Sequence, residues 1–176
     1  MKKVLLFIIL MLTSVFLFTA CKSGESEIYD SQGSKDETKM MGQSAELLSC
    51  DDGELKYIGF QKADPKLTDE DNAYVFVFEY TNHKEEPSEC YSTFNLSFFQ
   101  NSSELSDEVS YSTAAKEQSE LVHAFFNKAL KDGSVRFGQL VIAKDDNPIT
   151  VMAQEIGNKK HYEMIEVNLN DGSVSQ

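Results

Sequence analysis

Short runs of alternating apolar and polar residues, separated by turn residues, recur along most of the chain after residue 47. The clearest run spans residues 74–81, where four aromatic residues alternate with polar or branched ones and place Val75 and Val77 on the opposite face. Both faces of this run are apolar, which is typical of a central strand. The same period of two predicts further strands at residues 55–63, 94–99, 135–143, 149–154 and 162–169, with a short return strand from Glu104.

One apolar segment does not follow the period of two. Six apolar residues between Leu121 and Leu130 recur at helical spacing, and Gly133 stands where a helix would be capped. The pattern predicts either a helix over residues 114–130 or a short helix followed by a strand near residues 124–130. Both interpretations stay open at the level of the sequence.

Six to eight short strands with few helices indicate an all-β fold, an antiparallel β-sandwich with one short helix between Ala114 and Leu130. We expect the sandwich domain to span residues 47–170 and to be followed by a C-terminal tail at residues 171–176. A chain of about 120 residues buries roughly two thirds of its unfolded surface, which is enough for a core without a metal.

The first 21 residues have the features of a bacterial lipoprotein signal. Lys2 and Lys3 precede an uncharged apolar run over residues 4–20, and two small residues, Thr19 and Ala20, stand before Cys21. Cleavage before Cys21 would leave a thiol to carry a diacylglycerol, and two acyl chains hold a protein stably at a bilayer. We therefore predict a signal peptide at residues 1–20 and lipidation of Cys21. An ordinary signal peptide or an uncleaved anchor is the alternative.

Residues 21–46 differ in composition from the rest of the chain. They are rich in Ser and acidic residues and contain few large apolar side chains. Such a segment cannot bury enough surface to offset its conformational entropy, so we expect a disordered tether. About 25 flexible residues span roughly 25–30 Å.

The charge of the chain narrows its possible partners. The formal net charge is −13 and hydrophobic residues make up 41 % of 176 residues. So acidic a chain lacks the surplus of Lys and Arg that phosphate binding needs, which argues against nucleic acid and against adhesion to anionic lipid.

Two cysteines remain after Cys21 is assigned to the anchor. An even pair in an exported protein suggests a disulfide, and a hairpin between residues 55–63 and 74–81 would bring Cys50 close to the segment before Cys90. The bridge is therefore a prediction, and two unpaired thiols are the alternative.

No residues are predicted as catalytic, cofactor-binding or metal-binding. His83, His123 and His161 have no close metal-ligand spacing, and no serine stands in a nucleophile motif. The acidic clusters do not follow the calcium-loop pattern.

Several strand and turn segments resemble one known family. These are residues 76–82, 86–88, 99–101 with Glu104 and Leu105, 131–135 and 147–151. They are similar to the domain of unknown function 5067 family, extracellular lipoproteins of Gram-positive bacteria. The resemblance implies an immunoglobulin-like domain and no known activity, and it covers roughly residues 54–155. The apolar segment at 121–130 and the pair Cys50 and Cys90 depart from it.

These observations favour a lipoprotein on the outer face of the bacterial cell membrane, held there by its lipid anchor. Its sandwich is expected to be a non-catalytic binding module for another envelope protein or a wall polymer. An envelope enzyme of the hydrolase type, or a structural accessory of an exported complex, is the alternative.

Overall fold

The computed structural model describes residues 40–106 and 110–176. The described residues belong to one compact unit, Glu37–Gln176. No helix within the two described ranges is both long enough and apolar enough to cross a membrane.

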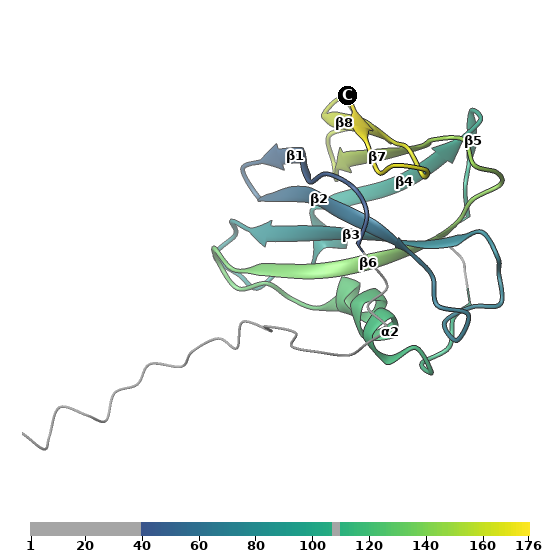
Figure 1. Ribbon diagram of the computed structural model, residues 1–176. Coiled ribbons are helices and arrows are strands. Elements are labelled where there is room, and N and C mark those ends of the chain that lie inside the picture. Colours follow the sequence, from purple (N-terminus) through teal and green to yellow (C-terminus); the bar gives the residue numbers. More distant parts are fainter. Residues whose placement is uncertain (1–39, 107–109) are drawn as a thin grey trace, which may run out of the picture. The chain divides into compact units, whose positions relative to one another are not determined.

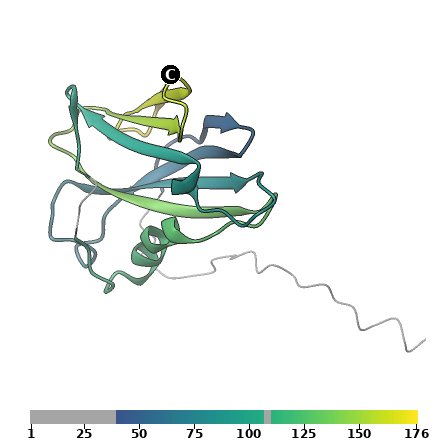
Figure 2. The same cartoon turned by 180° about the vertical axis from the view of Figure 1, so that it is seen from behind.

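Two antiparallel sheets make up this unit (Figures 1 and 2). The first sheet has the order β1-β2-β3-β6, formed by Ala45–Cys50, Gly53–Lys62, Ala73–Asn82 and Ser134–Ile142. The second sheet has the order β5-β4-β7-β8-β9, formed by Ser103–Glu104, Phe94–Gln100, Ile149–Glu155, Tyr162–Val167 and Val174–Ser175. The all-β sandwich predicted from the hydrophobic pattern is confirmed.

Aromatic side chains fill the space between the sheets. Strand β3 contributes Phe76, Phe78 and Tyr80, which are fully buried in the main core. Phe98 of β4 meets Phe76 and Phe78 across the sandwich, with ring centroids 5.5 and 6.2 Å apart. Edge-to-face contacts of this kind add to the free energy gained from burial itself. The predicted central strand is therefore confirmed, since β3 lies between β2 and β6.

A second, smaller core lies on the outer face of the first sheet. Val75 and Val77 point to this face and pack beneath α2, which spans Lys116–His123 (Figure 1). A Cβ atom at Gly138 would lie 2.7 Å from the Val75 side chain and 3.2 Å from that of Leu121, so the glycine lets the helix approach the sheet closely. The two apolar faces of β3 thus serve two different cores.

The segment from residue 114 to residue 130 follows neither predicted course in full. The helix α2 ends at His123, a 3₁₀ turn η2 follows at Ala124–Phe126, and a single β-bridge joins Ala129 to Ser88. The predicted short helix is confirmed, whereas the alternative strand is reduced to that bridge.

Two strands were not predicted. Strand β1 precedes the first predicted strand, and β9 lies at residues 174–175, inside the segment expected to be a tail. Strand β9 has only two residues and pairs with Glu166 and Val167, too few to produce a periodic signal in the sequence.

Candidate functional site

Two long connections meet at the end of the sandwich where β3 finishes and β6 begins. They comprise residues 83–93 and residues 124–133. Ser88 and Ala129 join them by two backbone hydrogen bonds, with N···O distances of 3.0 and 2.9 Å. We call this joined end of the domain the tip.

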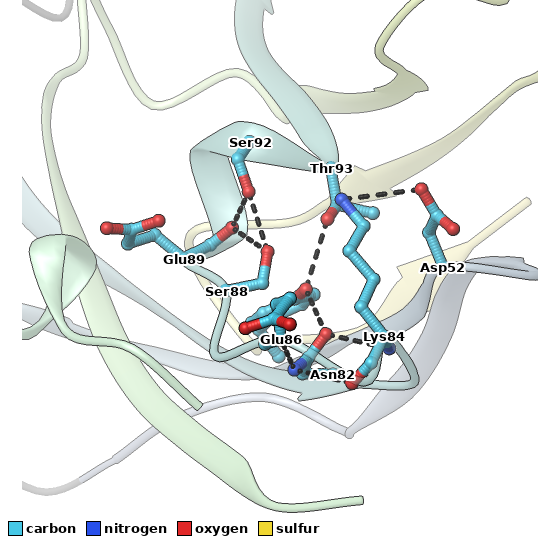
Figure 3. A network of polar contacts seen from close by, with 9 residues as sticks. Asp52, Asn82, Lys84, Glu86, Ser88, Glu89, Ser92 and Thr93 are labelled. Atoms are coloured by element: carbon cyan, nitrogen blue, oxygen red, sulfur yellow. Dashed lines mark hydrogen bonds and ion pairs between the residues drawn. The ribbon is translucent and has the colours of Figure 1, made fainter. Parts of the chain in front are cut away.

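Asn82, the last residue of β3, holds the tip together and is fully buried. Its side-chain nitrogen donates to the carbonyl oxygens of Lys84 and Glu86, at 3.3 and 2.9 Å (Figure 3). The same nitrogen donates to the carbonyl oxygen of Ala129 at 3.1 Å. The backbone N–H of Lys84 donates back to the Asn82 side-chain oxygen at 3.0 Å. One amide therefore bridges carbonyls of both connections.

Hydroxyl groups extend this network toward the second sheet. Tyr80 and Thr93 share a hydrogen bond of 3.0 Å between their hydroxyls, and Ser88 and Ser92 share one of 2.7 Å (Figure 3). The Ser92 hydroxyl also contacts the carbonyl oxygen of Glu89 at 2.8 Å. The 3₁₀ turn η1, Cys90–Ser92, is thereby fixed against the end of β3.

Three aromatic rings stand on this rigid base. Tyr91 of η1 and Phe126 of η2 are 44 % and 63 % exposed, and their ring centroids lie 6.0 Å apart. Phe125 lies 5.7 Å from Tyr91 and 5.2 Å from the core residue Phe137. We call Tyr91, Phe125 and Phe126 the aromatic cluster. It joins the main core at one side and reaches solvent at the other.

Charged pairs border the aromatic cluster. Lys128 lies 3.3 Å from the carboxylate of Glu89, and Lys131 pairs with Glu85. The pKa of Glu89 is lowered, first because its own backbone N–H donates to the carboxylate and then because Lys128 lies beside it. Apolar surface with a polar border is the usual anatomy of a protein interaction surface.

Of the predicted site cysteines that the structure describes, only Cys90 lies on an element of the aromatic cluster, directly before Tyr91 in η1. Cys21 lies outside the described residues. Cys50 ends β1 and is half-buried, whereas Cys90 begins η1 and is buried. Both are free thiols in the structure, in contrast to the predicted bridge, which stays a prediction for the exported protein. Burial raises the pKa of Cys50 and raises that of Cys90 to about 12.

The three histidines lie on separate elements. His123 contacts the hydroxyl of Tyr111 at 3.2 Å, His161 contacts the carboxylate of Glu155 at 2.7 Å, and His83 lies on the loop after β3. In residues 40–106 and 110–176, no three His, Cys, Asp or Glu side chains are grouped so as to hold a metal ion.

The aromatic cluster was not predicted as a site. Its two phenylalanines fell within the helical pattern at residues 121–130, where both count as apolar. Their adjacency gave no signal, because the apolar stripe of an amphipathic helix is wide enough to include two neighbouring residues.

Comparison with known proteins gives one match. A family model described as a domain of unknown function (DUF5067) matches residues 30–155, more than two thirds of the chain. No curated protein and no solved structure matches the chain.

Proposed function

Since the chain belongs to the family of the domain of unknown function DUF5067, which assigns it no activity, we propose a function from its own residues. The protein is a lipid-anchored module on the outer face of the bacterial membrane, and its sandwich binds another envelope component through the tip. The aromatic cluster is the observation that carries this proposal.

The anchor rests on the sequence around Cys21. The cationic start, the apolar run at residues 4–20 and the small residues before Cys21 together suit a lipoprotein signal. Diacylation at that thiol would hold the chain at the bilayer by two acyl chains.

The position of the tip suits a tethered binding module. The chain enters the described domain at Met41, whose backbone pairs with Phe60 on β2. Asn82 at the tip pairs with Gly53 on the same strand, seven residues away. At a rise of about 3.3 Å per residue, roughly 20 Å separate the two positions along β2. The tether therefore joins the domain well away from the aromatic cluster.

The rigidity of the tip favours binding. Exposed aromatic side chains on a backbone that is already fixed lose little conformational entropy when a partner covers them. The network around Asn82 provides that fixed backbone. A protein or a wall polymer with an apolar or ring surface is the partner we propose, because tyrosine and phenylalanine rings supply large contact area.

The anchor is tested by metabolic labelling with an alkyne analogue of palmitate. The wild-type chain is expected to carry the label in the membrane fraction, and Cys21→Ala is expected to lose it. Label that persists in Cys21→Ala would reject lipidation at this residue.

The binding surface is tested with the soluble domain, residues 37–176, and isolated cell envelopes from a strain lacking the protein. Phe126→Ser is expected to weaken saturable binding at least tenfold, because truncating a side chain that dominates an interface costs about 2 kcal/mol or more, and about 1.4 kcal/mol is a factor of ten. Met40→Ser is the control, since Met40 is 41 % exposed and lies near Gly59, away from the tip. Equal binding by both variants and the wild type would exclude the tip as the contact.

A further inference from the structure

Four of the six residues of β8 have an unpaired edge. Its neighbour β9 pairs with Glu166 and Val167 only. Along Tyr162 to Ile165, no strand in the described part of the chain lies on the side away from β7. An open strand edge presents backbone donors and acceptors to any extended chain that reaches it.

The hydrogen-bond pattern identifies which groups are open. His161 accepts a backbone bond from Glu155 of β7 at 3.0 Å, whereas Asn168 donates to Ser173 on the other side at 3.0 Å. Because antiparallel pairing alternates along a strand, the N–H and C=O groups of Tyr162 and Met164 point away from β7. None of these four groups has a partner within residues 40–106 and 110–176.

A groove of about 490 Å³ runs beside this edge. On one side it is lined by Glu46 to Ser49 of β1, which is itself the edge strand of the first sheet. On the other side it is lined by His161, Glu163 and Gln176. The groove therefore lies between two edge strands, one from each sheet.

The side chains around the open edge are apolar and acidic in alternation. Tyr162 and Met164 are 46 % and 45 % exposed and lie on the outer face of the second sheet. Glu163 stands between them, faces the groove and is exposed, and Glu46 lines the opposite wall. Lys159 and Lys160, in the turn before β8, do not line the groove.

We propose that β8 binds an extended segment of another protein, which adds to the second sheet as a strand in line with β9. Its apolar residues pair with Tyr162 and Met164 on the outer face. A lysine or arginine between them faces Glu163 in the groove. This surface is separate from the aromatic cluster, so the proposal goes beyond the function proposed above.

Charge decides between this partner and a second copy of the chain. In the register centred on Glu163, antiparallel pairing of two β8 edges about a two-fold axis places Glu163 opposite its counterpart, and like charges directly opposite destabilise a strand pair. A basic residue at that position gives a favourable cross-strand pair instead. In this register the edge therefore favours a basic, alternating segment over a second copy of the chain.

The probe is a synthetic eight-residue peptide of alternating valine and lysine, titrated into the soluble domain. Binding is expected to slow hydrogen exchange of the Tyr162 and Met164 amides, with a dissociation constant measured by calorimetry. A peptide of equal charge with proline in place of two valines is expected to bind at least tenfold more weakly, because proline cannot form the strand. An alternating valine and glutamate peptide is expected not to bind.

Three variants separate backbone pairing from side-chain contact. Met164→Pro removes the N–H at the open edge without removing a bond to β7, and it is expected to weaken peptide binding at least tenfold. Met164→Leu keeps the N–H and is expected to bind within about threefold of the wild type. Glu163→Lys, which leaves the backbone intact, is expected to reverse the preference between the lysine and glutamate peptides.

Three results would overturn the proposal. They are unchanged exchange at Tyr162 and Met164 with the lysine peptide, equal affinity for the proline peptide, or unchanged preference in Glu163→Lys. A concentration-dependent dimer that disappears in Met164→Pro would assign the edge to a second copy instead. Phe126→Ser is expected to leave the affinity for the lysine peptide unchanged. The proposal for the tip and the proposal for β8 can therefore be rejected independently.

Discussion

At the scale of single residues, Asn82 shows how one polar side chain can organise a surface. It is buried at the end of a strand whose other inward residues are aromatic, yet its amide satisfies carbonyls from residues 84, 86 and 129. Buried polar groups are tolerated when their hydrogen bonds are complete. The backbone below the aromatic cluster is therefore fixed by a residue that never touches solvent.

Replacement of Asn82 is predicted to destabilise the domain and loosen the tip. Asn82→Ala removes the side-chain hydrogen bonds to the carbonyls of residues 84, 86 and 129 and leaves a small cavity, so the free energy of unfolding is expected to fall by about 2–4 kcal/mol. Urea denaturation measures the change. Thr81→Ala, which removes only an exposed hydroxyl pair with Ser134, is the control and is expected to cost about 0.5 kcal/mol or less. Equal losses in the two variants would contradict the role given to Asn82.

At the scale of elements, Gly172 allows the turn after β8 to pack closely against the segment before β1. Gly172, in the turn between β8 and β9, has a φ of +73°. A Cβ atom there would lie 2.5 Å from the backbone nitrogen of Gly42, in the segment that leads into β1. The carbonyl of Gly172 also accepts a hydrogen bond from Gln43 at 3.2 Å. This contact connects the segment before β1 to the second sheet.

Gly172→Ala is predicted to be more damaging than the same change in a free turn. It combines a left-handed φ with a clash against backbone, and we expect a loss of about 2–3 kcal/mol of unfolding free energy. Gly157→Ala provides a matched control, because Gly157 has a φ of +87° but no atom within 4 Å of the added Cβ. That variant is expected to cost about 1 kcal/mol. Thermal unfolding of both variants tests the difference. Equal unfolding midpoints would show that the close approach of Gly172 to Gly42 does not add to the cost.

At the scale of the whole molecule, the two thiols link stability to pH and to oxidation. The pKa of Cys90 is raised to about 12 because the thiol is buried, against 9.0 for a free thiol. Above pH 9 the unfolded chain releases this proton while the folded chain keeps it. The protonated Cys90 thiol therefore makes its full contribution to the free energy of unfolding below pH 9. That contribution is lost as the pH rises toward 12.

The reduced protein is predicted to lose stability between pH 9 and pH 12, at up to about 1.4 kcal/mol per pH unit from this group. Urea denaturation at several pH values measures how the free energy of unfolding falls with pH. Cys90→Ala is the control, because it removes the thiol and keeps the tyrosines whose pKa values are also raised by burial. If the predicted bridge between Cys50 and Cys90 forms, oxidation removes this slope and adds about 3–4 kcal/mol by closing the loop. Equal slopes in the reduced wild type and Cys90→Ala would contradict the burial of an ionisable thiol.

Sequence reasoning was most reliable where one strand has a long and regular pattern. Residues 74–81 predicted both the strand β3 and its central place, because apolar side chains on both faces require cover on both faces. The same reasoning failed for β1 and β9. Their pairing depends on neighbours that are distant in sequence, and β9 is too short to show a period.

The alternation of apolar and polar residues determined by itself that the chain folds as a β-sandwich, because a period of two specifies which face of each strand is buried. The same pattern does not specify which strand lies beside which, and only the tertiary structure decided that β8 keeps an open edge. Nor does it distinguish the partly buried Phe125 from its exposed neighbour Phe126. In the tertiary structure Phe125 packs against the core residue Phe137, whereas Phe126 stays exposed to solvent at the tip.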